Sequence, residues 1–307
     1  MPTPAVAVEP DCWRRQVLVD AVEAGGGLVV GPSEADALVW AEPARADLMP
    51  AMLDDNPNIR WVQLPYAGIE PFLDMLRARA HLEWTCGKGV YAAPVAEHIL
   101  MLALAGMRGL ATYARSSTWA APEGRNLFGA NVTILGGGGI TEELLPLLAP
   151  FRCNVTVIRN RVSAMQGATT VVGPDRLHDI LPTTDLLVLA LALTPDTTEI
   201  IAKPELDLLS DHAWIINLAR GRHIATDDLV DALRAGQIGG AALDVTDPEP
   251  LPDGHPLWDL ANCLITPHVG NTPAMGLPLL ADRVEENVRR RVAGEPLVGP
   301  VDTDLGY

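Results

Sequence analysis

Lysine is almost absent from this chain of 307 residues, which carries only Lys88 and Lys203. Lysine and arginine together number 22 against 39 acidic residues, which gives a formal net charge of -17. Because such a charge repels phosphate backbones and anionic lipid surfaces, we expect neither a nucleic acid partner nor a membrane partner. An acidic chain that binds an anionic ligand needs a local positive group, so arginines in apolar or glycine-rich surroundings are the candidates.

Cysteine is also scarce, and the four cysteines at positions 12, 86, 153 and 263 form no C-x-x-C pair. This spacing argues against a zinc cluster and a small disulfide framework, so the sequence predicts no metal site and reduced thiols. The chain has no run of about 18 apolar residues, and its first residues lack a basic segment followed by an apolar stretch. We therefore expect a cytoplasmic protein.

The composition, 48% hydrophobic and 20% charged, is that of a globular protein long enough for two domains. From about residue 120 onward, short apolar runs alternate with helical stretches, as in βαβ units that build a parallel sheet. Six of these runs are predicted strands covered on both faces: residues 131–135, 154–158, 185–191, 213–217, 240–244 and 263–266. The sequence thus predicts an α/β domain of the Rossmann type, with a doubly wound parallel sheet, over residues 94–272.

The first ninety residues show a weaker version of the same alternation. Residues 94–111 predict a long apolar helix that begins with Pro94 and connects the domains. Residues 277–293 predict a last helix, which ends before Gly294 and which we expect to return to the first domain. Residues 1–93 and 273–307 would then form a smaller, flavodoxin-like α/β domain, with strands at residues 5–8, 28–30, 37–39, 61–63 and 82–86.

A glycine cluster, Gly136 to Gly139, follows a predicted strand and precedes a predicted helix over residues 141–149. Gly136 and Gly138 can form the tight turn whose backbone N–H groups bind the pyrophosphate of a dinucleotide. Thr141 occupies the third position of the G-x-G-x-x-G pattern, where we expect its side chain to hinder close approach of helix and strand. On this motif alone, a glycine-rich turn without a ligand is the alternative.

Arg159 follows the next predicted strand, where NAD-binding domains carry an acidic residue for the ribose hydroxyls. A carboxylate would repel the 2′-phosphate of NADPH, whereas a guanidinium can pair with it bidentately and stack on adenine. We therefore expect NADPH to be preferred over NADH. The alternative is that Arg159 and Arg161 are solvated surface charges.

Arg220, Glu249 and His268 lie at or just beyond the carboxyl ends of predicted strands, where open α/β sheets bind their ligands. The planar guanidinium of Arg220 can hold the carboxylate of a 2-oxo acid and polarise the adjacent carbonyl, whereas we expect Arg222 to face solvent. His268 can donate a proton to the carbonyl oxygen as hydride arrives. A lone histidine is more often structural, and Glu249 is the candidate carboxylate that would orient this imidazole.

With these motifs in register, the chain resembles the D-isomer-specific 2-hydroxyacid dehydrogenases over nearly its whole length. The resemblance is densest over residues 184–272, where LTPDTT, INLARGR, GGAALDVTDPEPLP, HPLW and LITPHVGNT follow the family's order. It implies hydride transfer between a nicotinamide and a small 2-oxo or 2-hydroxy acid. In this chemistry Arg220 orients the substrate and His268, assisted by Glu249, is the acid/base. The resemblance also implies a homodimer formed through the cofactor domains.

The same resemblance assigns substrate binding to the first domain and completes the set of cofactor contacts. The loop at Tyr66 would bind the substrate carboxylate through backbone N–H groups. The expected substrate residues are Tyr66, Ala67, Gly68, Lys88 and Gly89. The expected cofactor residues are Gly136, Gly138, Gly139, Ile140, Arg159, Thr194, Ala219 and Asp244, the last on the nicotinamide side.

Thr141, Arg159 and Thr246 depart from the family's pattern, the last where an aromatic residue is usual. These departures affect the cofactor and the pocket and remove none of the catalytic candidates. Two alternatives remain: a non-catalytic nucleotide-binding sensor or scaffold on the same fold, and an enzyme of formate or phosphite type. The acid itself stays open among glyoxylate, hydroxypyruvate, its phosphorylated form and a bulky oxo acid.

Overall fold

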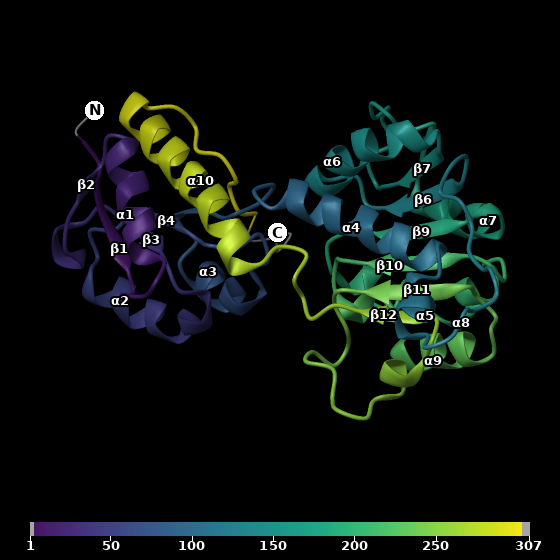
Figure 1. The fold of residues 1–307 in the computed structure, drawn as a ribbon. Coiled ribbons are helices and arrows are strands. Elements are labelled where there is room, and N and C mark those ends of the chain that lie inside the picture. Colours follow the sequence, from purple (N-terminus) through teal and green to yellow (C-terminus); the bar gives the residue numbers. More distant parts are fainter. Residues whose placement is uncertain (1–2, 303–307) are drawn as a thin grey trace. The chain divides into compact units, whose positions relative to one another are not determined.

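The structure is a computed structural model that describes residues 3–302, apart from the side chain of Glu70. The chain divides into two compact units, of which one is Ala92–Asn271 and the other combines the segments on either side of it. Each unit is built on its own parallel sheet, and helices cover both faces of each sheet (Figure 1). This confirms the predicted fold class of two α/β units.

The larger unit contains, among the described residues, a seven-stranded parallel sheet in the order β12-β11-β10-β9-β6-β7-β8. Six of the strands lie within the predicted runs. The seventh, β8, was not predicted, because it is a short edge strand that pairs only with β7. The strands are β6 (Asn131–Leu135), β7 (Asn154–Ile158), β8 (Thr170–Val172), β9 (Leu186–Leu189), β10 (Trp214–Asn217), β11 (Gly240–Leu243) and β12 (Cys263–Ile265).

Alternate side chains of this sheet enter two separate cores, as a strand period of two requires. Leu187 and Leu189 of β9 pack on one face, and Leu186 and Val188 pack on the other. The continuous apolar runs in the sequence follow from this burial on both sides. The first face is covered by α7 (Leu177–Ile180), α8 (Lys203–Leu206) and α9 (Thr226–Arg234), and the second by α4 (Ala92–Met107) and α6 (Gly139–Leu148).

The predicted helix over residues 94–111 is interrupted in the structure. α4 ends at Met107, and a separate helix, α5 (Leu110–Arg115), follows Gly109. Gly109 has a φ of 62°, in the left-handed region that glycine adopts at little cost, so the chain turns there. At the other end α4 begins at Ala92, and Pro94 lies in the first turn, where its missing N–H is not needed.

The smaller unit has a parallel sheet in the order β2-β1-β3-β4-β5, the strand order of flavodoxin-like folds. One face of this sheet is covered by α1 (Arg15–Ala24) and by α10 (Pro273–Ala293), which comes late in the sequence. The two helices lie side by side in Figure 1. The other face carries α2 (Met49–Asp55) and α3 (Leu73–Ala78). The strands are β1 (Ala5–Glu9), β2 (Leu28–Val29), β3 (Ala37–Trp40), β4 (Trp61–Gln63) and β5 (Glu83–Thr85).

α10 returns to the first half of the chain, as the sequence predicted. Its buried Asn287 donates from Nδ2 to Gln63 Oε1 at 2.8 Å, beside the end of β4. The helix starts at Pro273 rather than residue 277, because the side chain of Thr272 accepts a hydrogen bond from Met275 N and caps it.

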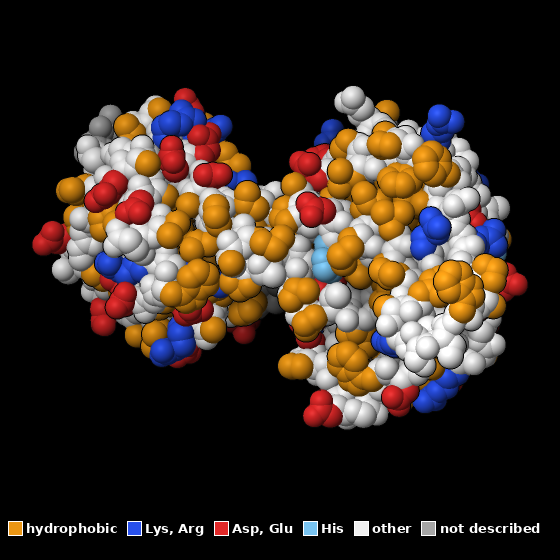
Figure 2. Space-filling view, in the orientation of Figure 1, with side chains coloured by type: hydrophobic (Ala, Val, Ile, Leu, Met, Phe, Trp, Pro, Cys, Tyr) orange, Lys and Arg blue, Asp and Glu red, His pale blue; other side chains and the backbone are white. Residues whose placement is uncertain are grey.

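Charged side chains of both signs are spread over the visible face of each unit. On the face shown in Figure 2, Lys and Arg side chains stand singly or in small groups among acidic and apolar ones. None of the helices in the described part of the chain has both the length and the apolar composition needed to cross a bilayer.

Candidate active site

The glycine turn of the larger unit lies at the switch point of its sheet. The strand order reverses between β6 and β9, and open α/β sheets bind ligands outside the carboxyl ends at such a point. Gly136 has a φ of 106°, and a Cβ on it would lie 2.2 Å from Ala190 O, so only glycine fits. In the described part of the chain, the N–H groups of Gly137 and Gly138 meet no acceptor. These N–H groups and the start of α6 at Gly139 suit a pyrophosphate.

Thr141 fits at the third position of the glycine pattern. Its side chain is fully buried, and its Oγ1 donates to Gly136 O at 2.8 Å. The hydroxyl therefore ties α6 to the glycine turn, although we expected it to hinder their approach. The departure from the glycine pattern leaves the turn intact.

Arg159 lies across the glycine turn with its side chain partly buried. A Cβ on Gly137 would lie 2.6 Å from Arg159 Cδ and 2.9 Å from Nε, so the absence of a side chain at Gly137 makes room for the arginine. Arg161 is exposed. Gly137 could not be singled out from the sequence, because a glycine between two motif glycines gives no signal of its own.

His268 and Glu249 form a hydrogen-bonded pair. His268 Nδ1 lies 2.6 Å from Glu249 Oε1, and the two side chains are 55% and 42% exposed. The Nε2 of His268 has no partner in the described part of the chain, so it can reach a ligand. His268 has a φ of 53°, an uncommon value for a residue with a side chain, and this conformation needs support from its surroundings.

That support comes from Asp244, which follows β11 and is 4% exposed. Its Oδ1 accepts hydrogen bonds from Val269 N at 2.9 Å and from Thr266 Oγ1 at 2.5 Å, and its Oδ2 accepts one from Gly270 N at 2.8 Å. Its carbonyl oxygen accepts the N–H of His268 at 2.8 Å. Asp244 therefore holds the whole turn that presents His268.

Two further histidines support the site, although no sequence motif indicated a role for either of them there. His98 of α4 lies with Nε2 3.1 Å from Thr266 Oγ1, behind the Asp244 cluster. His223 is fully buried, with Nδ1 2.9 Å from Thr197 O and Nε2 3.2 Å from Leu191 O, and this burial lowers its pKa. It ties the turn after β10 to residues 191–197, the segment that contains Thr194.

Arg220 stands in that turn, next to the loop that carries Glu249. Asn217 shapes the turn by accepting from Ala219 N at 3.0 Å and donating to Arg220 O at 2.9 Å. A Cβ on Gly221 would lie 2.0 Å from Thr246 O. The absence of a side chain at Gly221 therefore allows the turn that contains Arg220 to pack directly against the backbone that follows β11. The structure thus brings the Arg220 turn against the segment that leads to Glu249. Arg222 is exposed, as expected.

In the smaller unit, the loop of Tyr66, Ala67 and Gly68 follows β4 at the carboxyl edge of its sheet. Among the described residues, no acceptor meets the backbone N–H groups of these three residues. A loop with free N–H groups at a sheet edge is suited to an anion such as a carboxylate.

An arginine from a distant part of the sequence fixes the segment with Lys88 and Gly89. Arg283 of α10 donates from Nη1 to Cys86 O at 3.1 Å and to Lys88 O at 3.1 Å. Gly89 has a φ of 81°, so the segment turns sharply beside an exposed Lys88. The sequence gave no signal for this contact, since Arg283 lies about 200 residues after Lys88, on one face of a long helix.

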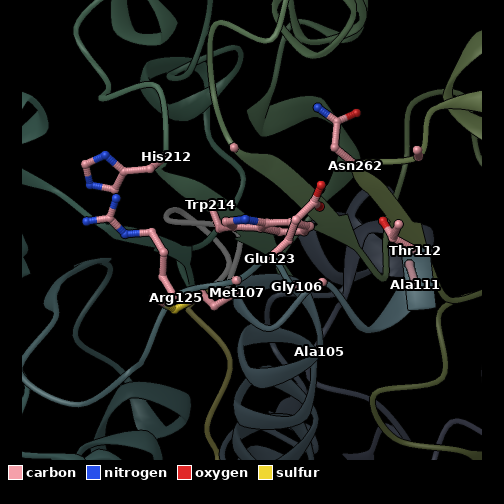
Figure 3. A pocket seen from close by; sticks show the side chains of 14 residues that line it. Ala105, Gly106, Met107, Ala111, Thr112, Glu123, Arg125, His212, Trp214 and Asn262 are labelled. Carbon is pink, nitrogen blue, oxygen red and sulfur yellow. The ribbon is translucent and has the colours of Figure 1, made fainter. Parts of the chain in front are cut away.

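A pocket of about 200 Å³ lies at the opposite edge of the larger sheet. Its lining includes Trp214 at the start of β10, Gly239 just before β11 and Asn262 just before β12. Figure 3 shows the indole of Trp214 among the labelled side chains. Because the catalytic candidates follow the carboxyl ends of the strands, this pocket at the amino ends is separate from them.

Hydride transfer at a carbonyl carbon requires a nicotinamide, a group that gives or takes the proton and a cation for the substrate oxygens. The glycine turn, the pair of His268 and Glu249, and Arg220 have the chemistry suited to these three tasks. The chain is therefore of the dehydrogenase class. The family model named D-isomer specific 2-hydroxyacid dehydrogenase, NAD binding domain, matches residues 98–270, and the chain belongs to this family. It is an NAD(P)-dependent oxidoreductase that moves hydride between a nicotinamide and a small 2-oxo or 2-hydroxy acid.

Two curated relatives match most of the chain. The chain is 36% identical over 305 residues to the "Uncharacterized protein in proB 3′region" of Corynebacterium melassecola, covering 97% of this chain and 98% of that one. It is 31% identical to glyoxylate/hydroxypyruvate reductase A of Yersinia enterocolitica, over 88% of this chain and 87% of that one.

Solved structures show the same fold over almost the entire chain. A D-isomer specific 2-hydroxyacid dehydrogenase from Xanthobacter autotrophicus, in complex with NADPH and MES, has a TM-score of 0.83 at 27% identity and covers 99% of this chain and 100% of its own. The NADPH-dependent glyoxylate/hydroxypyruvate reductase from Sinorhizobium meliloti, in complex with NADP and sulfate, has a TM-score of 0.82 at 26% identity, with the same coverage.

Proposed function

We propose that this enzyme reduces a small 2-oxo acid, of the glyoxylate or hydroxypyruvate type, with NADPH as the hydride donor. The observation that carries the proposal is the hydrogen-bonded pair of His268 and Glu249. Asp244 holds the turn that contains His268, and the turn that contains Arg220 packs against the backbone leading to Glu249. In this proposal the domain predicted over residues 94–272, which corresponds to the larger unit, binds the cofactor. The domain predicted over residues 1–93 and 273–307, which corresponds to the smaller unit, binds the substrate.

A bound nicotinamide would supply the hydride. The residues of the chain bind the substrate, polarise its carbonyl group and donate the proton. Arg220 binds the substrate carboxylate and polarises the carbonyl, where a fork of donors is better matched than a single ammonium. Protonated His268 donates from Nε2 to the oxygen as its negative charge develops. Glu249 accepts a hydrogen bond from Nδ1 and stabilises the imidazolium. Asp244 positions His268 through its hydrogen bonds to the backbone N–H groups of His268, Val269 and Gly270.

The other proposed contacts with substrate and cofactor involve residues at the carboxyl edge of each sheet. The free N–H groups of the Tyr66 loop bind the substrate carboxylate, and the Lys88 segment borders the substrate. The glycine turn and the start of α6 would hold the pyrophosphate of the cofactor. The proposed substrate residues are Tyr66, Ala67, Gly68, Lys88 and Gly89, and the proposed cofactor residues are Gly136, Gly138, Gly139, Ile140, Arg159, Thr194, Ala219 and Asp244.

The direct test is the loss of reduced-nicotinamide absorbance when the purified protein meets glyoxylate or hydroxypyruvate. Turnover with either acid is the expected result. Binding of the cofactor without turnover of any 2-oxo acid would support the sensor or scaffold alternative. Reduction of NADP⁺ by formate or phosphite would support the second alternative.

The preference for NADPH is tested at Arg159 and Gly137. We expect Arg159→Gln to lower kcat/KM for NADPH by about 10- to 100-fold, the effect of losing charge-assisted hydrogen bonds to a phosphate, and to change NADH little. Gly137→Ala should also reduce the NADPH preference, because its methyl group occupies the place of the Arg159 side chain. The fold should survive, since a flexible arginine can move away from a methyl group.

A double-mutant cycle separates this effect from general damage to the turn. In the Arg159→Gln background, Gly137→Ala should change the ratio of NADPH to NADH activity no further, since the arginine it displaces is gone. Arg161→Gln is the matched control, because Arg161 is exposed two residues away. Equal losses with both cofactors, or the same effect at Arg161, would refute a phosphate-binding role for Arg159.

We further propose a cytoplasmic homodimer that pairs through the larger unit. Apolar side chains are exposed along this unit's surface: Met101 is 47% exposed, Leu110 is 56% exposed and Trp119 is fully exposed. A contiguous apolar patch marks an interaction surface, and we propose that these side chains belong to one. The four cysteines form no disulfide, which suits a reducing compartment. Sedimentation of the purified protein at twice the monomer mass would support the homodimer, and a monomer would refute it.

A further inference from the structure

Arg14 lies at the switch point of the smaller sheet. The order β2-β1-β3 reverses between β1 and β3, and Arg14 stands between the end of β1 at Glu9 and the start of α1. Ligands of doubly wound sheets bind beyond the carboxyl ends of the strands at this place. Arg14 is only 7% exposed, although an arginine is rarely buried unless it is paired.

The surroundings of Arg14 provide contacts but no negative charge. Its Nη2 donates to Tyr66 Oη at 3.1 Å, and its Cζ lies 5.6 Å from the centre of the Tyr66 ring and 5.1 Å from that of Trp13. Among the described side chains, no aspartate or glutamate forms an ion pair with it. The acidic group that ends β1, Glu9, interacts instead with Arg15. Within the described part of the chain, Arg14 is therefore a buried cation without a paired anion, although the net charge of the chain is -17.

Tyr66 connects this cation to the proposed substrate loop. The same residue receives the hydrogen bond from Arg14 and begins the loop with free N–H groups. Tyr91 holds Tyr66 in place, because their rings meet edge to face at 6.1 Å and Tyr91 Oη donates to Pro65 O. A short molecule whose carboxylate occupies the loop would therefore have its other end near Arg14.

We propose that Arg14 is a specificity residue that binds a second anionic group of the substrate, so that the enzyme acts on a dianionic 2-oxo acid. This inference rests on the proposed function, and it narrows the acids that the site accepts. The second group is a carboxylate or a phosphate, since a guanidinium pairs bidentately with either. The phenol of Tyr66 moves aside or shares the guanidinium when that group arrives.

Two pairs of acids with matched carbon chains test the proposal. Oxaloacetate is compared with 2-oxobutanoate for a second carboxylate, and phosphonooxypyruvate with hydroxypyruvate for a phosphate. The wild-type enzyme should prefer the dianion in at least one pair, which identifies the group. Arg14→Met should lower kcat/KM for that dianion by about 10- to 100-fold, because charge-assisted hydrogen bonds are lost, and change kcat/KM for its monoanionic partner by less than about threefold.

Further variants distinguish recognition from support of the loop. Arg14→Lys keeps the charge and should recover part of the preference, whereas Arg15→Met removes a neighbouring arginine and should leave it unchanged. Equal losses for both members of a pair in Arg14→Met would show that Arg14 only supports Tyr66. A wild-type enzyme that prefers the monoanions would equally overturn the inference.

The failure of this inference differs from the failure of the proposed function. Turnover of monoanions without any preference for dianions overturns only the role of Arg14. Absence of turnover with all four acids and with glyoxylate overturns the proposed function. In that case the protection of the protein against thermal unfolding by oxaloacetate or phosphonooxypyruvate decides the role of Arg14. Protection in the wild type that Arg14→Met loses supports binding, and protection absent from the wild type or equal in both proteins refutes it.

Discussion

Replacing His268 by alanine is expected to lower kcat by about 100- to 10,000-fold, the usual contribution of a positioned acid or base. The proposed proton donor is then absent, while the glycine turn and Arg159 are untouched. NADPH should therefore bind as in the wild type. Steady-state kinetics with a 2-oxo acid and a fluorescence titration with NADPH measure the two quantities separately.

A matched control is available in the same unit. His178 also pairs with a carboxylate, its Nε2 lying 2.7 Å from Glu205 Oε1, and it is 61% exposed. His178→Ala should keep full activity, because this pair lies outside the proposed site. A His268→Ala enzyme that retains activity, or one that loses NADPH binding, would contradict the assignment of His268 as the acid.

Replacing Arg220 by lysine is expected to lower kcat/KM for the 2-oxo acid by about 100-fold or more, because a single ammonium cannot replace two parallel charge-assisted hydrogen bonds. The charge is conserved, so the loss would report geometry. Both kcat and KM should worsen, since the proposed contact holds the ground-state carboxylate and polarises the carbonyl.

Arg222→Lys provides the comparison for this variant. Arg222 lies in the same turn but is exposed, so its replacement should change activity little. The affinity for NADPH should be similar in the two variants. If Arg220→Lys were as active as the wild type, or if Arg222→Lys lost as much activity, the proposed orientation of the substrate by Arg220 would be wrong.

The sequence predicted the sheets well, because their strands are buried on both faces and therefore read as short apolar runs. The strand β8 escaped prediction, since Thr170 to Val172 form a three-residue edge strand whose side chains are exposed or only partly buried. The sequence also did not predict that the helix over residues 94–111 is interrupted at Gly109. A single glycine within an apolar stretch does not show whether its φ is positive.

The candidate site was predicted where residue type and strand position coincide. His268 and Glu249 were proposed as partners on this basis, and the structure places them 2.6 Å apart. The residues that were overlooked act through contacts distant in sequence. Arg14 meets Tyr66 across 52 positions, and Gly137 matters only because Arg159 folds over it. Such contacts depend on tertiary structure and leave no local pattern.

The discontinuity of the smaller unit determines the order in which the two cores can close during synthesis. Residues 92–271 are contiguous, so the larger unit has all its strands and helices once they have left the ribosome. The sheet of the smaller unit is made first, yet one of its faces lacks Leu280, Val284 and Val288 until α10 arrives. The nascent chain therefore carries an incomplete first sheet while its second unit can already fold, which reverses the usual order from the amino terminus.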